Sequence, residues 1–280
     1  MDRTSDRILL LSGEAGGMTP EVESTIAEAF SDYLRVDFNP DDDLRGRVAD
    51  DATVIVAGGD GTIGFVARAL AGTSATLGLL SLGTNNNFAR ALGLPDDLDG
   101  AIAAVKGGKS QPITLGMIGD RPFLETASIG LFGEAIELGE TLKDRVFREI
   151  PARVRAVIAT RPFEFSISGD IDARGRARSL VFSNTPTTGT QMAVGDSTPA
   201  GPTLDLSVRV GASRSDIVGR MLASVFLDRH VDPDGMNLRF STVTITTTPI
   251  MDVHADNECV AKTPVTISAR PHAISVIHPA

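Results

Sequence analysis

Residues 54–64 read VIVAGGDGTIG, in which an apolar β-branched run meets a glycine-rich loop and then a helical pattern. The run Thr53–Ala57 predicts a buried strand, and Ile63–Ala71 predicts a helix. Glycine allows a backbone to turn sharply and to approach a ligand closely, while a helix N-terminus presents free N–H groups. The stretch therefore predicts a phosphate-binding loop, although a tight strand–helix turn without a ligand would have the same pattern.

A second loop of the same design, LGTNNNFAR at residues 82–90, follows the next expected strand, Leu77–Ser81, and leads into a helical pattern over Asn85–Leu92. Loops after successive parallel strands lie side by side at the carboxyl edge of the sheet, where α/β folds bind ligands. The asparagines supply amide donors and acceptors, and Arg90 can pair with a phosphate. An asparagine N-cap on a short helix is the simpler interpretation of this loop taken alone. The two loops together favour a nucleotide site.

The residues from Gly59 to Gly64 also fit G-x-G-x-x-G, the pattern of dinucleotide-binding dehydrogenases. Such a site needs an acidic residue about 20 positions later to bind the ribose. No Asp or Glu follows Asp60 until Asp96, and the motif follows the second expected strand rather than the first. The dehydrogenase interpretation is therefore set aside.

The composition is that of an ordinary globular protein, with 280 residues of which 42% are hydrophobic and 22% charged. A formal net charge of −10 argues against a nucleic-acid partner. The single cysteine, Cys259, cannot form an internal disulfide, which fits a reducing cytoplasm. No run approaches the ~20 apolar residues of a spanning helix, and Ile8–Leu11 is too short for a secretory signal. We expect a cytoplasmic protein whose contact with membranes, if any, is peripheral.

The pattern of the chain changes near residue 120. Before it, apolar runs alternate with helical patterns, including a strand at Ile8–Ser12 and a helix at Pro20–Leu34 capped by Thr19, which predicts a parallel sheet flanked by helices. After it, we expect helical stretches at Leu131–Thr160 and Ser213–Asp228, and strands at Phe163–Ser168, Arg178–Asn184, Leu204–Val210, Leu238–Thr248 and Val265–Ala269. The second half is therefore predicted to be a β-rich, sandwich-like domain, whose exposed edge strands would allow a homodimer.

The motifs G-G-D-G-T at residues 58–62 and G-T-N-N-N-F-A-R at residues 83–90 together resemble those of the diacylglycerol kinase catalytic family, which groups bacterial diacylglycerol kinases with sphingosine and ceramide kinases. Phe123–Glu137, Val181–Asn184 and the segment Asp256–Glu258 extend the resemblance over nearly the whole chain. It implies an α/β nucleotide-binding domain at 1–120, joined by a last strand at 271–280, and a β-rich lipid-acceptor domain at 121–270. It also implies transfer of the γ-phosphoryl group of ATP to a lipid hydroxyl, with Mg²⁺.

The resemblance assigns roles to individual residues. It places a metal on Asp60, the general base at Asp256 and an orienting partner for that base at Glu258. Taken alone, Asp256-Asn257 is typical of a two-residue hairpin turn, and Asp60 of a helix N-cap. The nucleotide-binding residues that the family pattern implies are Gly58, Gly59, Asp60, Gly61, Thr62, Gly83, Thr84, Asn86, Asn87 and Arg90.

The sequence also departs from the family pattern. The second motif has Asn87 where the family has aspartate, and Gly195–Pro202 lacks the carboxylate pair that often holds a structural Mg²⁺. The lipid kinase interpretation competes with an NAD kinase, which shares the first loop, and with a non-catalytic nucleotide- or lipid-binding relative. Diacylglycerol, ceramide and a sphingoid base all stay open as acceptors. The cationic stretch Lys143–Arg155 would seat the protein on anionic lipid, or form a solvated helix face.

Overall fold

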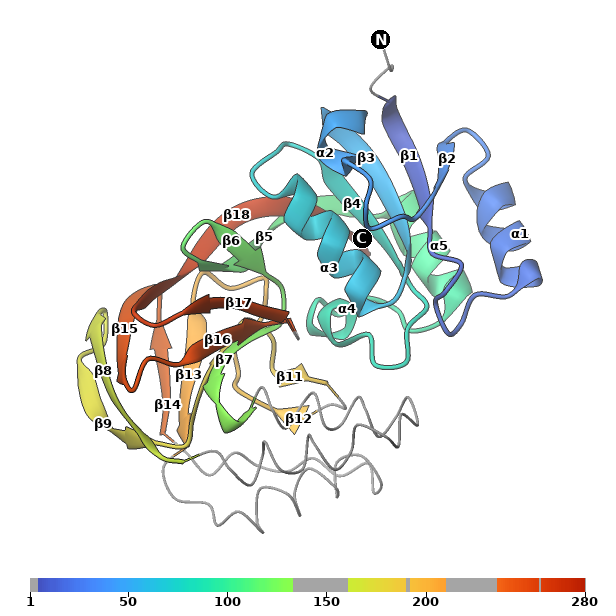
Figure 1. Ribbon diagram of the computed structural model, residues 1–280. Helices are drawn as coiled ribbons and strands as arrows, with labels where there is room; N and C mark the ends of the chain where they lie inside the picture. Colours follow the sequence, from blue (N-terminus) through green and yellow to red (C-terminus); the bar gives the residue numbers. More distant parts are fainter. Residues whose placement is uncertain (1–4, 133–160, 190–191, 210–235, 257, 280) are drawn as a thin grey trace. The chain divides into compact units, whose positions relative to one another are not determined.

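A computed structural model of the chain describes residues 5–132, 161–189, 192–209, 236–256 and 258–279. The chain divides into two compact units (Figure 1). The first unit comprises Met1–Leu115, Pro199–Gly201 and Arg270–Ala280, and the second comprises Gly116–Thr198 and Pro202–Ala269.

The first unit is built on a parallel sheet with the strand order β2-β1-β3-β4-β18. Residues from Arg270 onward in the last strand belong to this unit, where Ser275 and Val276 pair with β4. The elements are β1 (Ser5–Leu11), α1 (Pro20–Ala29), β2 (Leu34–Asp37), α2 (Leu44–Arg47), β3 (Val48–Gly58), α3 (Asp60–Leu70), β4 (Thr76–Ser81), α4 (Asn87–Ala91), α5 (Leu98–Gly107), β5 (Lys109–Ile118) and β18 (Val265–His278).

Helices cover both faces of this sheet because its central strands are apolar on both sides. Ile55 and Ala57 of β3 pack with α1 and α5 in one core cluster. Val54 and Val56 alternate with them, are fully buried, and point to the opposite face. Helix α3 packs against β3 there (Figure 1). The predicted α/β architecture, a parallel sheet flanked by helices, is thus confirmed.

The first helix is shorter than the sequence pattern predicts. Thr19 caps it as expected, accepting a hydrogen bond from the Val22 N–H, but the helix ends at Ala29 and not at Leu34. The rings of Phe30 and Tyr33 pack edge to face with centroids 5.6 Å apart. The chain then forms β2, whose residues pair in parallel with β1. The helix ends before Leu34 because residues 34–37 instead form hydrogen bonds to β1, which they could not form within a longer helix.

The second unit is a sandwich of two antiparallel layers. One layer has the order β14-β13-β10-β7-β16-β17, and the other contains β15, β8 and β9 beside the start of β18. Side chains from both layers, including Phe163, Phe182 and Val243, form one core cluster. The strands are β6 (Arg121–Phe123), β7 (Thr126–Gly130), β8 (Phe163–Gly169), β9 (Ala173–Ala177), β10 (Ser179–Ser183), β11 (Thr187–Thr188), β12 (Met192–Ala193), β13 (Leu204–Arg209), β14 (Met236–Phe240), β15 (Thr242–Thr248), β16 (Asp252–Ala255) and β17 (Glu258–Lys262).

The β-rich prediction for the second half is therefore confirmed, with differences in detail. The expected strand Leu238–Thr248 is two strands, because Ser241 breaks the run between β14 and β15. The strands β5, β6, β7 and β9 were not predicted, since their sequences are short or broken by glycine and proline. Of the helical stretch expected at Leu131–Thr160, residues 133–160 lie outside the described residues, as does the whole stretch expected at Ser213–Asp228.

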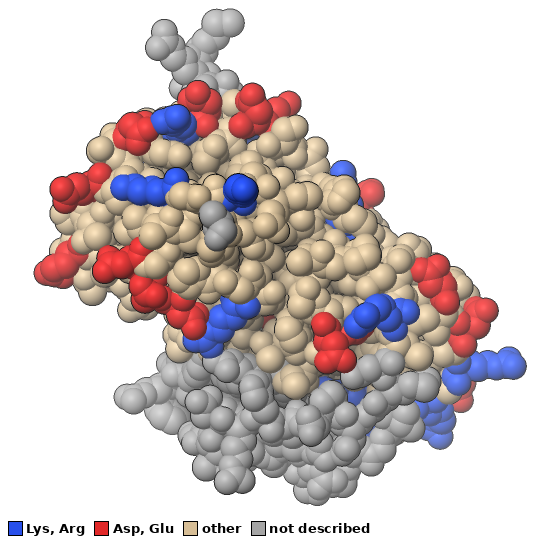
Figure 2. Space-filling model, turned by 180° about the vertical axis from the view of Figure 1, so that it is seen from behind, with Lys and Arg blue, Asp and Glu red and all other residues tan. Residues whose placement is uncertain are grey.

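Basic and acidic side chains are scattered among neutral residues over the described surface in Figure 2, and several acidic ones gather along its upper left edge. Several of the basic residues form exposed ion pairs, for example Arg7 with Asp32 and Arg45 with Asp50. Such pairs contribute little stability individually because water screens them. In the part of the chain that the structure describes, no helix is both long and apolar enough to cross a bilayer.

His278 near the end of β18 is expected to make the first unit sensitive to acid. Its side chain is only 9% exposed, and its Nε2 has no hydrogen-bond partner among the described residues. Burial lowers the pKa of the imidazole below its ordinary value of 6.5, because the charged form loses hydration. The unfolded chain then binds more protons, so this contribution to stability is present above pH 6.5 and is lost as the pH falls below it.

The measurement is thermal unfolding of the wild type and of His278→Leu at pH 7.5 and pH 5.5, which are roughly one unit on either side of the ordinary histidine pKa. We expect Tm to fall more on acidification in the wild type than in the variant. An equal fall in both proteins would show that His278 does not carry this acid sensitivity.

Candidate active site

The first glycine loop joins β3 to α3. Gly59 is the N-cap in extended conformation and Asp60 is the first helical residue, so Asp60 is not the N-cap. The helix starts with the hydrogen bond from the Ile63 N–H to the Gly59 carbonyl, 3.0 Å long. A Cβ at Gly58 would lie 2.7 Å from the Cβ of Thr62, whereas a Cβ at Gly61 would meet nothing within 4 Å. The loop is therefore closed toward the helix and open at Gly61, beside the positive end of α3.

The second glycine loop lies directly against the first. A Cβ built on Gly83 would lie 2.9 Å from the Cα of Gly59 and 2.8 Å from Oδ1 of Asn86. The Gly83 N–H donates to Asn86 Oδ1 over 2.9 Å, and the Asn86 side chain donates to the Ser81 carbonyl over 3.4 Å. Asn86 has φ +50°, a left-handed conformation that asparagine tolerates. Thus Asn86 shapes the loop, and only a residue without a side chain fits at Gly83.

A third loop, after β1, reaches the same edge of the sheet. The Gly17 N–H donates to the Leu82 carbonyl over 2.9 Å. A Cβ at Gly17 would lie 3.0 Å from that carbonyl oxygen, while Gly13 and Gly16 have open space. The parallel register, in which Gly58 is paired with Ser81, aligns these strand ends. The carboxyl edge of the sheet therefore gathers three glycine loops, as the spacing of the first two motifs predicts.

The other residues of the second motif differ in exposure. Asn87, where the family pattern has aspartate, is 2% exposed at the start of α4. Thr84 is exposed. Arg90 is also exposed, and its Nε donates to Asp96 over 3.0 Å. An arginine held by a surface carboxylate can exchange that partner for a phosphate, since exposed pairs are weak.

In the second unit, Asp256 is fixed by backbone hydrogen bonds. It lies in the turn between β16 and β17 with φ +42°. The Leu124 N–H donates to its Oδ2 over 2.8 Å, and the N–H groups of Glu125 and Thr126 donate to its Oδ1 over 2.9 and 3.4 Å. The Asp256 N–H donates in return to the Thr126 carbonyl over 3.0 Å. We call residues 124–126 the β7 corner, because they lead into β7.

Asn184 holds the β7 corner through its own hydrogen bonds. Its N–H donates to the Glu125 carbonyl over 2.8 Å, and its side-chain amide donates to the Leu124 carbonyl over 3.0 Å. The Glu125 carboxylate accepts a hydrogen bond of 2.8 Å from the hydroxyl of Thr188, which is buried. Neither Glu125 nor Thr188 is among the site residues predicted from the sequence. One signal in the sequence could have identified Glu125. It directly follows the apolar pair Phe123-Leu124, at a position where an alternating strand would place a core residue, and a charged residue is rarely buried.

Glu258 pairs with a basic side chain, and the segment Gly195–Pro202 is bound by a buried carboxylate. The Glu258 carboxylate forms an ion pair with Arg121, and both side chains are exposed. In Gly195–Pro202, the N–H groups of Asp196 and Ser197 donate to the 3%-exposed Asp205 over 2.6 and 2.7 Å. Among the described residues, no group of three or more His, Cys, Asp or Glu side chains is arranged to hold a metal ion.

The predicted site residues fall into two groups. The residues of both glycine motifs belong to the first unit, and Asp256 and Glu258 belong to the second. Within the first unit the structure brings the two motifs into contact, and within the second it attaches Asp256 to the β7 corner. The cationic stretch 143–155 lies outside the described residues.

Two domain models of known families match the chain. Residues 18–118 match the diacylglycerol kinase catalytic domain, and residues 145–278 match the YegS C-terminal NAD kinase beta sandwich-like domain. A Cronobacter sakazakii protein named "Probable lipid kinase YegS-like" is 32% identical over 169 residues, 56% of this chain and 53% of the relative. A Mycobacterium tuberculosis protein named diacylglycerol kinase is 28% identical over 241 residues, 81% of this chain and 76% of the relative.

The crystal structure of a Bacillus anthracis diacylglycerol kinase has the same fold, with a TM-score of 0.72 and 18% identity over 98% of this chain and 97% of that one. The chain spans about half the length of several curated relatives that it matches. The two matching domain models follow one another along the chain, and they identify residues 18–118 as a diacylglycerol kinase catalytic domain and residues 145–278 as a YegS C-terminal NAD kinase beta sandwich-like domain.

Proposed function

We propose that this protein is an ATP-dependent lipid kinase, which transfers the γ-phosphoryl group of ATP to the hydroxyl of a membrane lipid. The observation that carries the proposal is the contact between the two glycine loops, in which a Cβ at Gly83 would lie 2.9 Å from Gly59. Two backbone turns so close together at the start of α3 form a cradle whose N–H groups can surround phosphate oxygens. Diacylglycerol, ceramide and a sphingoid base are the acceptors that we would test, each met at a membrane surface.

The residues of the first unit would hold the nucleotide. Phosphoryl transfer requires mainly that the phosphates are held and their charge is neutralised. The residues from Gly58 to Thr62 and from Gly83 to Asn87 would bind the phosphates, with Arg90 beside them. A Mg²⁺ ion commonly takes one or two carboxylates and completes its shell with substrate phosphates and water. Asp60, a single carboxylate at the start of α3, fits a Mg²⁺ that arrives with the nucleotide.

Asp256 would accept the proton of the attacking lipid hydroxyl. In that step the lipid oxygen forms a bond to the γ-phosphorus, the bond to the bridging oxygen breaks, and ADP leaves. The backbone N–H groups of the β7 corner support this role because they fix the direction of the carboxylate. Glu258, paired with Arg121, would act further out, by holding the turn that carries Asp256.

The test is transfer of label from γ-labelled ATP, with Mg²⁺, to diacylglycerol, ceramide, sphingosine and NAD in separate assays. Label in one lipid would support the proposal and identify the acceptor. Label in NAD alone would replace it with the NAD kinase function. No label in any acceptor, while ATP still binds, would favour a non-catalytic relative. The mass of the protein in solution tests the expected homodimer.

Gly61→Ala is expected to separate ATP binding from folding. The added methyl group meets no protein atom within 4 Å, so the fold should be kept, and alanine favours a helix by up to about 1 kcal/mol over glycine. The same methyl group would occupy the open side of the phosphate loop. We therefore expect an unchanged or higher Tm together with ATP affinity lowered by about tenfold or more, as for lost charge-assisted hydrogen bonds. Calorimetric titration with ATP measures this, and wild-type affinity would argue against phosphates at Gly61.

A further inference from the structure

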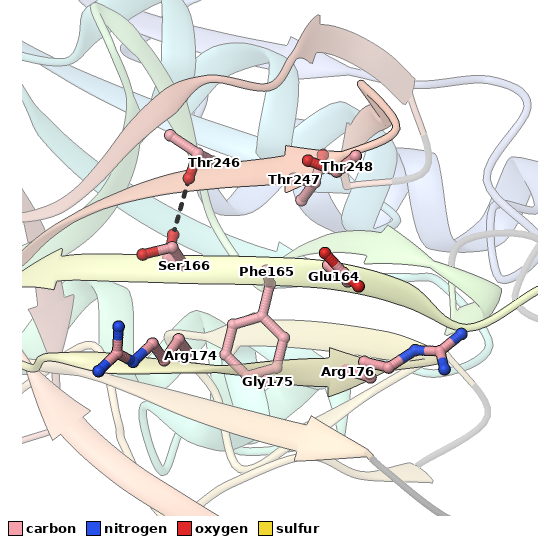
Figure 3. Close-up of a pocket in the computed structure, with 9 residues that line it drawn as sticks. All are labelled: Glu164, Phe165, Ser166, Arg174, Gly175, Arg176, Thr246, Thr247 and Thr248. Atoms are coloured by element: carbon pink, nitrogen blue, oxygen red, sulfur yellow. Dashed lines mark hydrogen bonds between the residues drawn. The ribbon is translucent and has the colours of Figure 1, made fainter.

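A groove of about 520 Å³ lies on the second unit, on the sheet formed by β15, β8 and β9 (Figure 3). The register of these antiparallel strands aligns two rows of side chains across it. Alternating residues such as Phe165 and Ile245 point to the core, so the two rows lie on the outer face. The first row is Thr246, Ser166 and Arg174, and the second row is Thr248, Glu164 and Arg176.

The two arginines of the groove differ from most of the arginines that the structure describes. Within the described residues, Arg174 and Arg176 have neither an ion-pair nor a hydrogen-bond partner, although Glu164 lies directly across from Arg176. By contrast, the arginines that form exposed ion pairs are Arg7, Arg35, Arg45, Arg47, Arg90 and Arg121. The chain has a net charge of −10, so two unpaired guanidinium groups on one short strand form a local positive region. These groups can bind an anion from solution.

The remaining side chains of the groove suit an anion rich in oxygen. Residues two apart on a strand are separated by about 6.6 Å. The Arg174 and Arg176 side chains extend in opposite directions along β9 in Figure 3, so a ligand held by both requires these flexible side chains to turn toward each other. Hydroxyl groups of Ser166 and Thr248 stand on the neighbouring strands, whereas the Thr246 hydroxyl donates its single proton to the Ser166 carbonyl over 3.4 Å. The guanidinium groups and hydroxyls together supply several hydrogen-bond donors for the oxygen atoms of a phosphate group.

We propose that the β15–β8–β9 groove is a phosphate-binding site, separate from the glycine loops, for a phosphate group carried by a lipid headgroup or by a soluble ester. The phosphate would lie between Arg174 and Arg176 over the Ser166 hydroxyl of the first row. Glu164 at one end disfavours anions there and directs the phosphate toward Arg174. This site does not depend on the proposed kinase activity.

The competing explanation is that the arginines protect the sheet edge. Strand β9 pairs only with β8 among the described strands, and charged side chains on an edge strand discourage pairing with another chain. The experiment therefore measures both phosphate binding and self-association. The variant is Arg174→Gln with Arg176→Gln, and the matched control is Arg45→Gln with Arg47→Gln, an equal loss of charge in the first unit.

Binding is measured with inorganic phosphate and glycerol 3-phosphate, and with sedimenting phosphatidylcholine vesicles that contain or lack phosphatidylglycerol. The soluble phosphates form one arm of the experiment and the vesicles form the other. In one of these two arms, the groove variant should bind its probe at least about fivefold more weakly than the control. Weaker binding of the soluble phosphates would indicate a soluble ester, and weaker binding of the vesicles would indicate a lipid headgroup. Glu164→Gln should bind inorganic phosphate more tightly, because it removes a like charge. Equal binding by the groove variant and the control in both arms would overturn the proposal. Increased self-association with unchanged binding would assign the arginines to edge protection instead.

Discussion

Asp256→Asn is expected to lower the rate of phosphoryl transfer to lipid by roughly 10²- to 10⁴-fold, the usual contribution of a general base. ATP affinity should hardly change, since the expected nucleotide contacts belong to the first unit. An asparagine oxygen can still accept from the Glu125 N–H, but its amide group would oppose a backbone donor such as the Leu124 N–H. We therefore also expect stability to fall by about 1–3 kcal/mol. Steady-state kinetics and thermal unfolding measure the two effects.

A loss of activity in Asp256→Asn could arise from the β7 corner alone, and Asn184→Ala provides the control. This variant removes the side-chain hydrogen bond to the Leu124 carbonyl and leaves the Asp256 carboxylate in place. If Asp256 is the base, the acid limb of the pH profile of kcat/KM should vanish in Asp256→Asn and persist in Asn184→Ala. An equal loss of rate in both variants, with the acid limb kept in both, would assign Asp256 a purely structural role.

Gly83→Ala is expected to remove most ATP binding and to destabilise the first unit. The new Cβ would lie 2.9 Å from the Cα of Gly59, a backbone atom that cannot move away without shifting the first loop. It would also lie 2.8 Å from the Asn86 oxygen that closes the second loop. Overpacking of this kind costs about 1–3 kcal/mol, which lowers Tm by roughly 2–10 °C in a chain of this size. ATP affinity should fall by about tenfold or more, because both loops change shape.

Gly107→Ala is the matched control for this substitution. It adds the same methyl group at the last residue of α5, outside the glycine loops, where a Cβ meets nothing within 4 Å. Calorimetric titration with ATP and thermal unfolding should give values close to wild type for Gly107→Ala. Wild-type ATP affinity in Gly83→Ala would show that contact between the two loops is not required for the nucleotide.

The two glycine variants of the predicted nucleotide site report different properties of one cradle. Gly83→Ala tests the packing of backbone against backbone, and Gly61→Ala tests the open side on which phosphate would lie. If only Gly83→Ala weakens ATP binding, the loops matter for the fold of the first unit more than for the ligand. If both variants weaken it while Gly61→Ala keeps its Tm, the cradle is a ligand site.

The fold class and the nucleotide half of the candidate site were predictable from the sequence because their signals are local. An apolar β-branched run at Thr53–Ala57, three glycines and a helical pattern follow one another within 20 residues. Parallel strands bring the loops that follow them to one edge whatever the details of packing. That is why Gly59 and Gly83 could be placed together before their contact was seen. Alternating and apolar runs likewise predicted the β-rich second unit.

The acceptor half depended on the tertiary structure. The Asp256 carboxylate accepts a hydrogen bond from the Leu124 N–H, 132 residues away in the chain. Because the donors to Asp256 are backbone N–H groups, the side chains of the residues that supply them do not reveal them in the sequence. The end of α1 at Ala29 and the groove that contains Arg174 likewise depend on which strands become neighbours. Sequence patterns report the periodicity of a segment and its preference to be buried. Pairing between distant strands is decided by how the whole core packs, and only the folded chain shows which polar groups then meet.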